Sequence, residues 1–100
     1  MQSLPIQFSA LSPARIVKYA PPETLVKGNP EQAVRLFFES AEHGLRSGIW
    51  EGEAGAYRLD FEAGKHEFFY ITKGRVRITP DRGEPSEYGA GDACLLPGGF

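Results

Sequence analysis

The spacing of hydrophobic and polar positions favours short strands over most of this chain. Runs rich in β-branched and aromatic residues alternate with turns made of Gly, Pro and Asp. We expect strands at residues 14–19, 48–53, 56–62, 66–72, 75–79 and 92–96, a turn at 80–83, and a tight hairpin at Lys73-Gly74. Regular short strands without a convincing helix are typical of a sandwich or barrel, so the fold class is predicted to be all-β.

Residues 30–43 carry conflicting local signals. Asn29 as N-cap, Pro30 at the first helical position and Gly44 after the last turn favour a helix. The alternation of apolar side chains between Val34 and Phe38 instead suits a strand, in which successive side chains point to opposite faces. Local propensity alone therefore favours a helix, and the alternation is the signal that opposes it.

Two groups of turn residues stand at fixed spacings in the second half of the chain. Gly55, Glu67 and Gly74 form the first group, and Gly91, Pro97 and Gly99 form the second. In this order and spacing they resemble the two sequence motifs of the cupin superfamily. The closest resemblance is to small single-domain cupins grouped with ureidoglycine aminohydrolase and the ethanolamine-utilisation cupin, and it covers roughly residues 13–100.

The resemblance implies a cupin jelly-roll β-barrel, also called a double-stranded β-helix. It implies one domain at residues 13–100, preceded by an arm at residues 1–12, and an extended conformation for residues 33–40. In related cupins the last barrel strands follow the position of Phe100, so the barrel is expected to lack them here. We expect the arm around Leu4, Ile6 and Phe8, a second subunit, or both to cover the gap, and a homodimer is the favoured arrangement. The alternative is that the sequence is shortened relative to the natural protein.

The resemblance also predicts which side chains face the barrel interior. Because side chains alternate along a strand, the inward set is Tyr57, Leu59, Phe61, Glu67, Phe69 and Ile71. The outward set is Arg58, Asp60, His66, Phe68 and Tyr70. An apolar pocket with a few polar groups suits a small organic ligand. The candidate ligand-binding residues are Trp50, Tyr57, Phe61 and Phe69, although aromatic residues on short strands more often belong to a core.

Glu67 is the candidate catalytic residue. A carboxylate in an apolar barrel can act as a general acid or base, because desolvation favours its protonated form. The alternative is a structural residue that pairs with an arginine or is held by water.

The usual cupin metal centre is not expected. Phe61 and Ala63 stand where the first motif carries histidines, and neither side chain can coordinate a metal. The fourth ligand position lies beyond Phe100. We therefore predict no metal and no other cofactor.

Four other residues have simpler interpretations. Asp92 is expected to bond the backbone N–H groups of a turn, and Arg75 and Arg77 are expected to face solvent or form salt bridges. Cys94 is expected to be a small buried apolar residue, and as the single cysteine it favours a cytoplasmic location.

Composition restricts the partners. The formal net charge is −2 and no Lys/Arg cluster is present, which argues against nucleic acid, and no apolar run is long enough for a membrane span. The predicted function is binding of a small organic molecule in a metal-poor barrel, with metal-independent acid–base chemistry led by Glu67. The alternatives are a metal-dependent hydrolase of the ureidoglycine type and a non-catalytic binding or sensing module.

Overall fold

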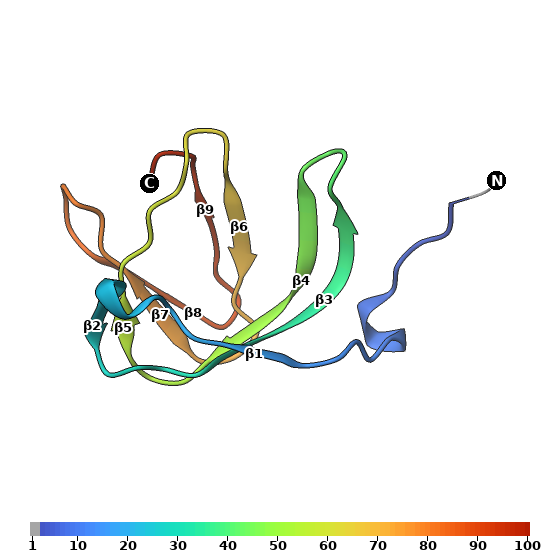
Figure 1. Ribbon diagram of the computed structural model, residues 1–100, viewed down its shortest axis with the longest axis horizontal. Helices are drawn as coiled ribbons and strands as arrows, with labels where there is room; N and C mark the ends of the chain where they lie inside the picture. The colour runs from blue at the N-terminus through green and yellow to red at the C-terminus, as the bar shows by residue number, and fades with distance from the viewer. Residues whose placement is uncertain (1–2) are drawn as a thin grey trace. The chain divides into compact units, whose positions relative to one another are not determined.

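The computed structural model describes residues 3–100 (Figure 1). The chain forms two compact units, of which the first ends at Arg58 and the second is Leu59–Phe100. All regular structure in residues 3–100 is strand, apart from two short 3₁₀ helices, so the all-β prediction is confirmed. Within the same residues, no helix is long and apolar enough to cross a membrane.

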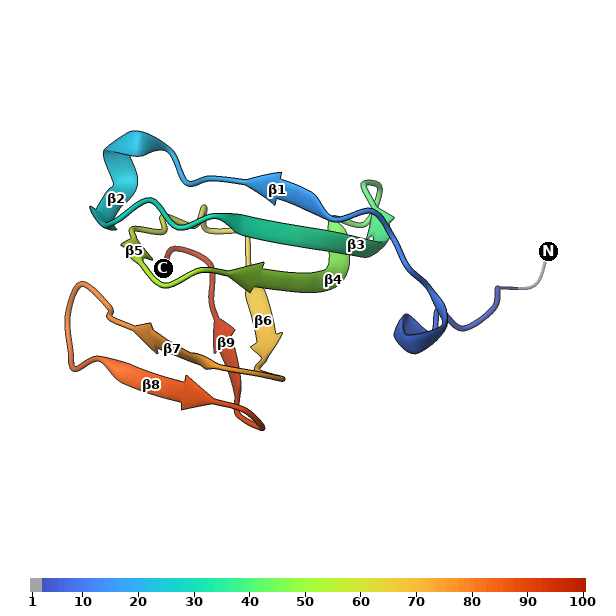
Figure 2. The same cartoon turned by 90° about the horizontal axis from the view of Figure 1, so that it is seen from below.

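The first unit contains five strands, named here in chain order: β1 (Ile16–Lys18), β2 (Leu25–Lys27), β3 (Gln32–Ser40), β4 (Leu45–Gly52) and β5 (Ala56–Tyr57). The 3₁₀ helices are η1 (Phe8–Ala10) and η2 (Pro22–Thr24). Strands β1, β3 and β4 form an antiparallel sheet with β3 in the centre, as Figure 2 shows, and β2 pairs with β5.

Strand β3 settles the conflict between helix and strand. Residues 33–40 are extended, as the resemblance implied, and the helical capping signals were misleading. Strand β3 has a neighbour on each side, so its backbone groups form ladder hydrogen bonds that a helix would have to replace. Two of the residues that suggested helix ends have other roles. Pro30 is a buried residue that precedes β3, and Gly44 ends the loop between β3 and β4 with a φ of 65°.

A β-bulge interrupts the pairing of β3 with β4. Leu36 lies opposite Gly48 and Phe38 lies opposite Ser47, so Phe37 is the additional residue. The bulge reverses the alternation of side chains along β3. Phe38 therefore lies on the opposite face from Leu36, although the sequence pattern places the two together.

Phe37 has a partner in the amino-terminal arm. The ring of Phe8 stacks on it with 4.1 Å between centroids and 11° between planes. Leu4 remains 73% exposed and Ile6 remains 42% exposed. Within the first unit, Phe8 is thus the aromatic residue that fastens the arm to the sheet.

The second unit contains β6 (Glu67–Tyr70), β7 (Arg75–Ile78), β8 (Ser86–Gly89) and β9 (Ala93–Leu96). Strand β6 pairs with β9, and β7 pairs with β8. The prediction of a hairpin at Lys73-Gly74 was wrong, because β6 and β7 are not paired with each other. Gly74 does adopt the positive φ expected of a turn, at 85°, but the turn leads the chain from one ribbon into the other.

The predicted strand at 56–62 ends early, at Tyr57. Beyond Tyr57, Phe61 lies in irregular backbone that is hydrogen-bonded to residues 99 and 100. Its N–H donates to the carbonyl of Phe100 at 2.7 Å, and its carbonyl accepts from the N–H of Gly99 at 3.1 Å. These local bonds replace those of the expected ladder.

Candidate functional site

A polar and aromatic cluster on the first sheet joins two of the predicted ligand-binding residues. Trp50 donates its indole N–H to Oε1 of Gln32 at 2.9 Å, and the Tyr57 hydroxyl donates to the same oxygen at 3.1 Å. Gln32 is only 4% exposed, whereas Trp50 is 50% exposed. The structure therefore holds two aromatic side chains from β4 and β5 against one buried amide from β3.

The hydrogen bonds fix the orientation of the Gln32 amide. An indole N–H can only donate, so the atom that it contacts must be the amide oxygen. The oxygen then uses both lone pairs, one for Trp50 and one for Tyr57. The Nε2 group of Gln32 points the other way, and no group in residues 3–100 accepts a hydrogen bond from it.

The indole of Trp50 lies along its own strand. A Cβ built on Gly52 would come within 2.7 Å of two carbons of the six-membered ring, so the absence of a side chain at Gly52 leaves room for that ring. The six-membered ring thus lies against β4 at Gly52. Gln32 lies directly opposite Gly52 in the register, which explains how the N–H reaches the amide.

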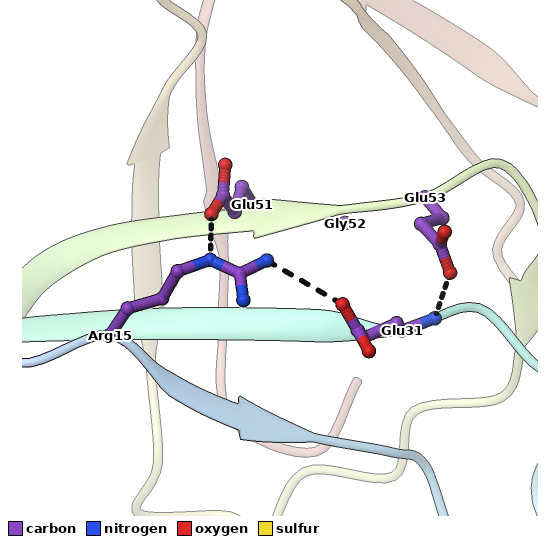
Figure 3. A pocket seen from close by; sticks show the side chains of 5 residues that line it. All are labelled: Arg15, Glu31, Glu51, Gly52 and Glu53. Atoms are coloured by element: carbon purple, nitrogen blue, oxygen red, sulfur yellow. Dashed lines mark hydrogen bonds and ion pairs between the residues drawn. The ribbon is translucent and has the colours of Figure 1, made fainter.

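Strand alternation places a charged group on the other face of this sheet (Figure 3). Arg15 donates to Glu51 at 2.7 Å and lies 3.6 Å from Glu31. Glu53 accepts from the backbone N–H of Glu31 at 2.8 Å, and Tyr19 donates its hydroxyl to the Glu31 carboxylate at 2.9 Å. Together with Gly52, the arginine and the three carboxylates line a shallow surface hollow.

The same contacts perturb protonation in this hollow. The hydrogen bond from Arg15 lowers the pKa of Glu51, and the reciprocal bond raises the pKa of Arg15. The hydrogen bond to Glu31 raises the pKa of Tyr19. Arg15 thus pairs with Glu51 and Glu31, while the Glu53 carboxylate is held by a backbone N–H.

In the second unit, Phe61 is 8% exposed. Its ring centroid lies 6.3 Å from that of Phe100, and the ammonium of Lys65 lies 4.9 Å from its centroid. The aromatic side chain that stands at a motif histidine position is thus part of a packed cluster.

Glu67 and Phe69 share one face of the β6–β9 ribbon with their partners Leu96 and Cys94. Leu96 is buried, Phe69 and Cys94 are half-buried, and Glu67 is exposed, with no hydrogen bond or ion pair to any group in residues 3–100. On the other face, Phe68, Tyr70 and Leu95 are 67%, 59% and 59% exposed.

Tyr88 packs on the same face as Phe69 and Cys94. The two rings meet edge to face, with centroids 5.8 Å apart and an interplanar angle of 86°. A hydrogen bond with the Cys94 thiol raises the pKa of Tyr88. Cys94 is therefore a half-buried free thiol beside aromatic groups, which is close to the apolar role predicted for it.

Four polar residues of the second unit have structural partners. Asp92 accepts from the N–H of Gly89 at 2.8 Å, so its predicted turn-capping role is confirmed. Arg75 and Arg77 both pair with Glu87, at 2.9 and 2.7 Å, and hydrogen bonds from Arg77 and then Arg75 lower the pKa of Glu87. His66, which was predicted simply to point outward, accepts from the N–H of Gly98 through Nδ1 at 2.8 Å.

The side chains do not suit the metal that most cupins carry. Within residues 3–100, no group of three or more His, Cys, Asp or Glu side chains could hold a metal ion. Phe61 is packed against other rings, and Nδ1 of His66 is occupied by a backbone N–H. A donor set of one exposed carboxylate does not meet the usual requirement for a transition metal.

A protein-family model also matches this chain. The model of the EutQ-like cupin domain matches residues 39–100, which is more than half of the chain. The protein therefore belongs to the EutQ-like cupin family, and its all-β structure agrees with a jelly-roll fold. Membership supports a small-molecule-binding role of the cupin type. Comparisons with curated proteins and with solved structures gave no match.

Gln32 is the site residue that sequence reasoning missed. It lies outside both motifs, and glutamine is an ordinary surface residue. The usable signal was its place in the apolar alternation, two residues before Val34 on the same side of β3. A polar residue at a buried position of a strand needs a partner, and here it has two.

Proposed function

We propose that this cupin binds a small organic molecule at the face of the sheet that carries Trp50 and Tyr57. The convergence of these two side chains on one buried amide oxygen carries the proposal. Hydrogen bonds that fix the aromatic rings in advance lower the ordering cost of binding. The half-exposed indole then offers a rigid apolar surface beside polar groups, which is the usual composition of a ligand site.

Glu67 is proposed as the acid–base residue, with proton transfer independent of any metal. Its carboxylate has no partner in residues 3–100 and lies on the ribbon face that carries Phe69. Phe61 and Phe69 are proposed as ligand-binding residues of the second unit. The protein is proposed to be a cytoplasmic homodimer, for which the single cysteine and the resemblance to dimeric cupins are the supports.

The binding proposal can be tested with a metabolite screen. Trp50 is the only tryptophan in the sequence, so any change in indole fluorescence reports directly on this face. We expect at least one small organic compound to change the emission and to raise the melting temperature. A broad screen in which every stabilising compound leaves the emission unchanged contradicts binding at this face.

A matched pair of variants then tests Tyr57. Tyr57→Phe removes the hydroxyl that contacts Gln32, whereas Tyr70→Phe makes the same change on a residue that is 59% exposed in the second unit. We expect only the first to weaken ligand binding, by roughly three- to tenfold. Equal affinities for both variants argue against a role for Tyr57.

Turnover of the ligand is examined separately. Glu67→Gln is expected to abolish conversion of a bound ligand while retaining its affinity, and Glu62→Gln serves as the control at another exposed glutamate. Unchanged turnover in Glu67→Gln removes Glu67 from the chemistry. A ligand that binds and is never converted identifies a binding or sensing module.

A further inference from the structure

Gln32 has one hydrogen-bonding group that the fold leaves unused. Its Oε1 accepts from Trp50 and Tyr57, and its Nε2 finds no acceptor in residues 3–100. Among these residues, no fully buried side-chain nitrogen or oxygen lacks a partner. Nε2 must therefore reach solvent, although the residue as a whole is 96% buried.

We infer that the ligand is a planar molecule that presents a hydrogen-bond acceptor to Nε2 of Gln32 while its ring lies on Trp50. This inference rests on the proposed function and names the ligand class for the same face. A ligand acceptor can replace the water at this donor, whereas a ligand that displaces the water without supplying an acceptor leaves the donor unpaired and binds more weakly.

The orientation of the amide determines the polarity of the ligand. Both lone pairs of Oε1 are occupied, so Gln32 offers donors and no acceptor. The amide cannot rotate to exchange its oxygen and nitrogen, because the indole N–H of Trp50 would then face a second donor. Ketones, amides and carboxylates fit this arrangement, and a ligand whose polar group only donates does not.

The preference for a planar ligand comes from Trp50. Gly52 lets the six-membered ring lie against β4, and half of the side-chain surface stays exposed. An aromatic or conjugated ring can stack on that exposed surface with a contact energy beyond simple area burial. An ammonium could also lie over the ring by a cation–π contact, so the two ligand classes must be compared directly.

Two simple probes separate these classes. Acetophenone has a planar ring and an acceptor only, whereas benzylammonium has a ring and a donor only. In ¹H–¹⁵N spectra, the chain has a single indole N–H signal, from Trp50, and the Gln32 side-chain pair is assigned by its loss in Gln32→Glu. We expect acetophenone to shift the signals of both residues and benzylammonium to shift neither.

Gln32→Glu is the matched variant, because its second oxygen replaces Nε2 while the first still accepts from Trp50 and Tyr57. We expect the indole signal of the free variant to stay near its original position and the affinity for acetophenone to fall at least about tenfold. Where circular dichroism shows this variant to be unfolded, the comparison of the two probes on the wild-type chain decides the question.

The outcomes separate the two proposals. Acetophenone that shifts the indole signal but binds Gln32→Glu equally well overturns the acceptor inference and leaves binding at Trp50 intact. Benzylammonium bound more tightly than acetophenone by the wild-type chain also overturns it, as does the absence of any shift with acetophenone. The metabolite screen followed by Trp50 fluorescence decides the proposed function independently of these results.

Discussion

Removing the amide of Gln32 should destabilise the first unit by a predictable amount. Gln32→Leu introduces an apolar side chain of similar size and leaves the Trp50 N–H and the Tyr57 hydroxyl without their shared acceptor. A neutral hydrogen bond contributes about 1 kcal/mol, and a donor that can reach water loses less when its partner is removed. Because Trp50 is half-exposed, we expect a total loss of roughly 1–2 kcal/mol in the free energy of unfolding, or about 5–15 °C in melting temperature.

A double-mutant cycle isolates the contact with Trp50. Trp50→Phe keeps an aromatic ring and removes the N–H, so the coupling between it and Gln32→Leu should be about 0.5–1.5 kcal/mol. Urea unfolding followed by far-ultraviolet circular dichroism measures all four proteins. The control cycle uses Gln7→Leu, since the Gln7 side chain bonds Ser9 in the arm, and its coupling to Trp50→Phe should be near zero. A coupling below about 0.3 kcal/mol at Gln32 refutes the reasoning, because additive effects are expected only of independent sites.

Three further results are expected. Gly48→Ala should lower stability by about 2 kcal/mol or more in urea unfolding, because its Cβ would overlap the backbone carbonyl of Arg35, whereas Gly64→Ala, with open space around it, should be close to neutral. Glu87→Gln should lower the melting temperature at pH 7, because arginine hydrogen bonds lower the pKa of Glu87 in the folded state. The difference in melting temperature should disappear as the pH falls below 4.5, and an unchanged difference at pH 3 contradicts this. Elemental analysis after dialysis against a weak chelator should find no stoichiometric zinc, iron or manganese, and a metal that is lost in Glu67→Gln refutes that expectation.

The fold was predictable where turns and motifs act locally. Gly74, Gly91 and Gly99 all adopt positive φ, as turn glycines should, and the strands at β4, β6, β7 and β9 lie within a few residues of their predicted bounds. The connection after Gly74 was not predictable from that turn. A glycine permits a reversal of the chain, but which strands pair depends on contacts between residues distant in sequence.

The candidate site was predictable only in part, for a related reason. Trp50 and Tyr57 stand out as aromatic residues on short strands, and the structure does bring them together. Gln32 brings them together by accepting a hydrogen bond from each. Its burial and its register opposite Gly52 make this possible, and neither can be predicted from residue type. The roles proposed for Glu67, Phe61 and Phe69 remain predictions to be tested by the variants above.

The bulge at Phe37 bears on how such chains can change length. Because the bulge absorbs the additional residue, Phe38 and the residues after it pair with β4 as they would in a strand without Phe37. Insertions and deletions in the 41–44 loop leave the Gln32–Trp50 side of the sheet unaltered. Deleting Phe37 would remove the ring on which Phe8 stacks and would leave Phe38 opposite Ser47, on the face where it already lies. Lineages of this protein are therefore expected to vary in length at that loop and at the bulge, and those without the additional residue are expected to lack the stacking partner of Phe8.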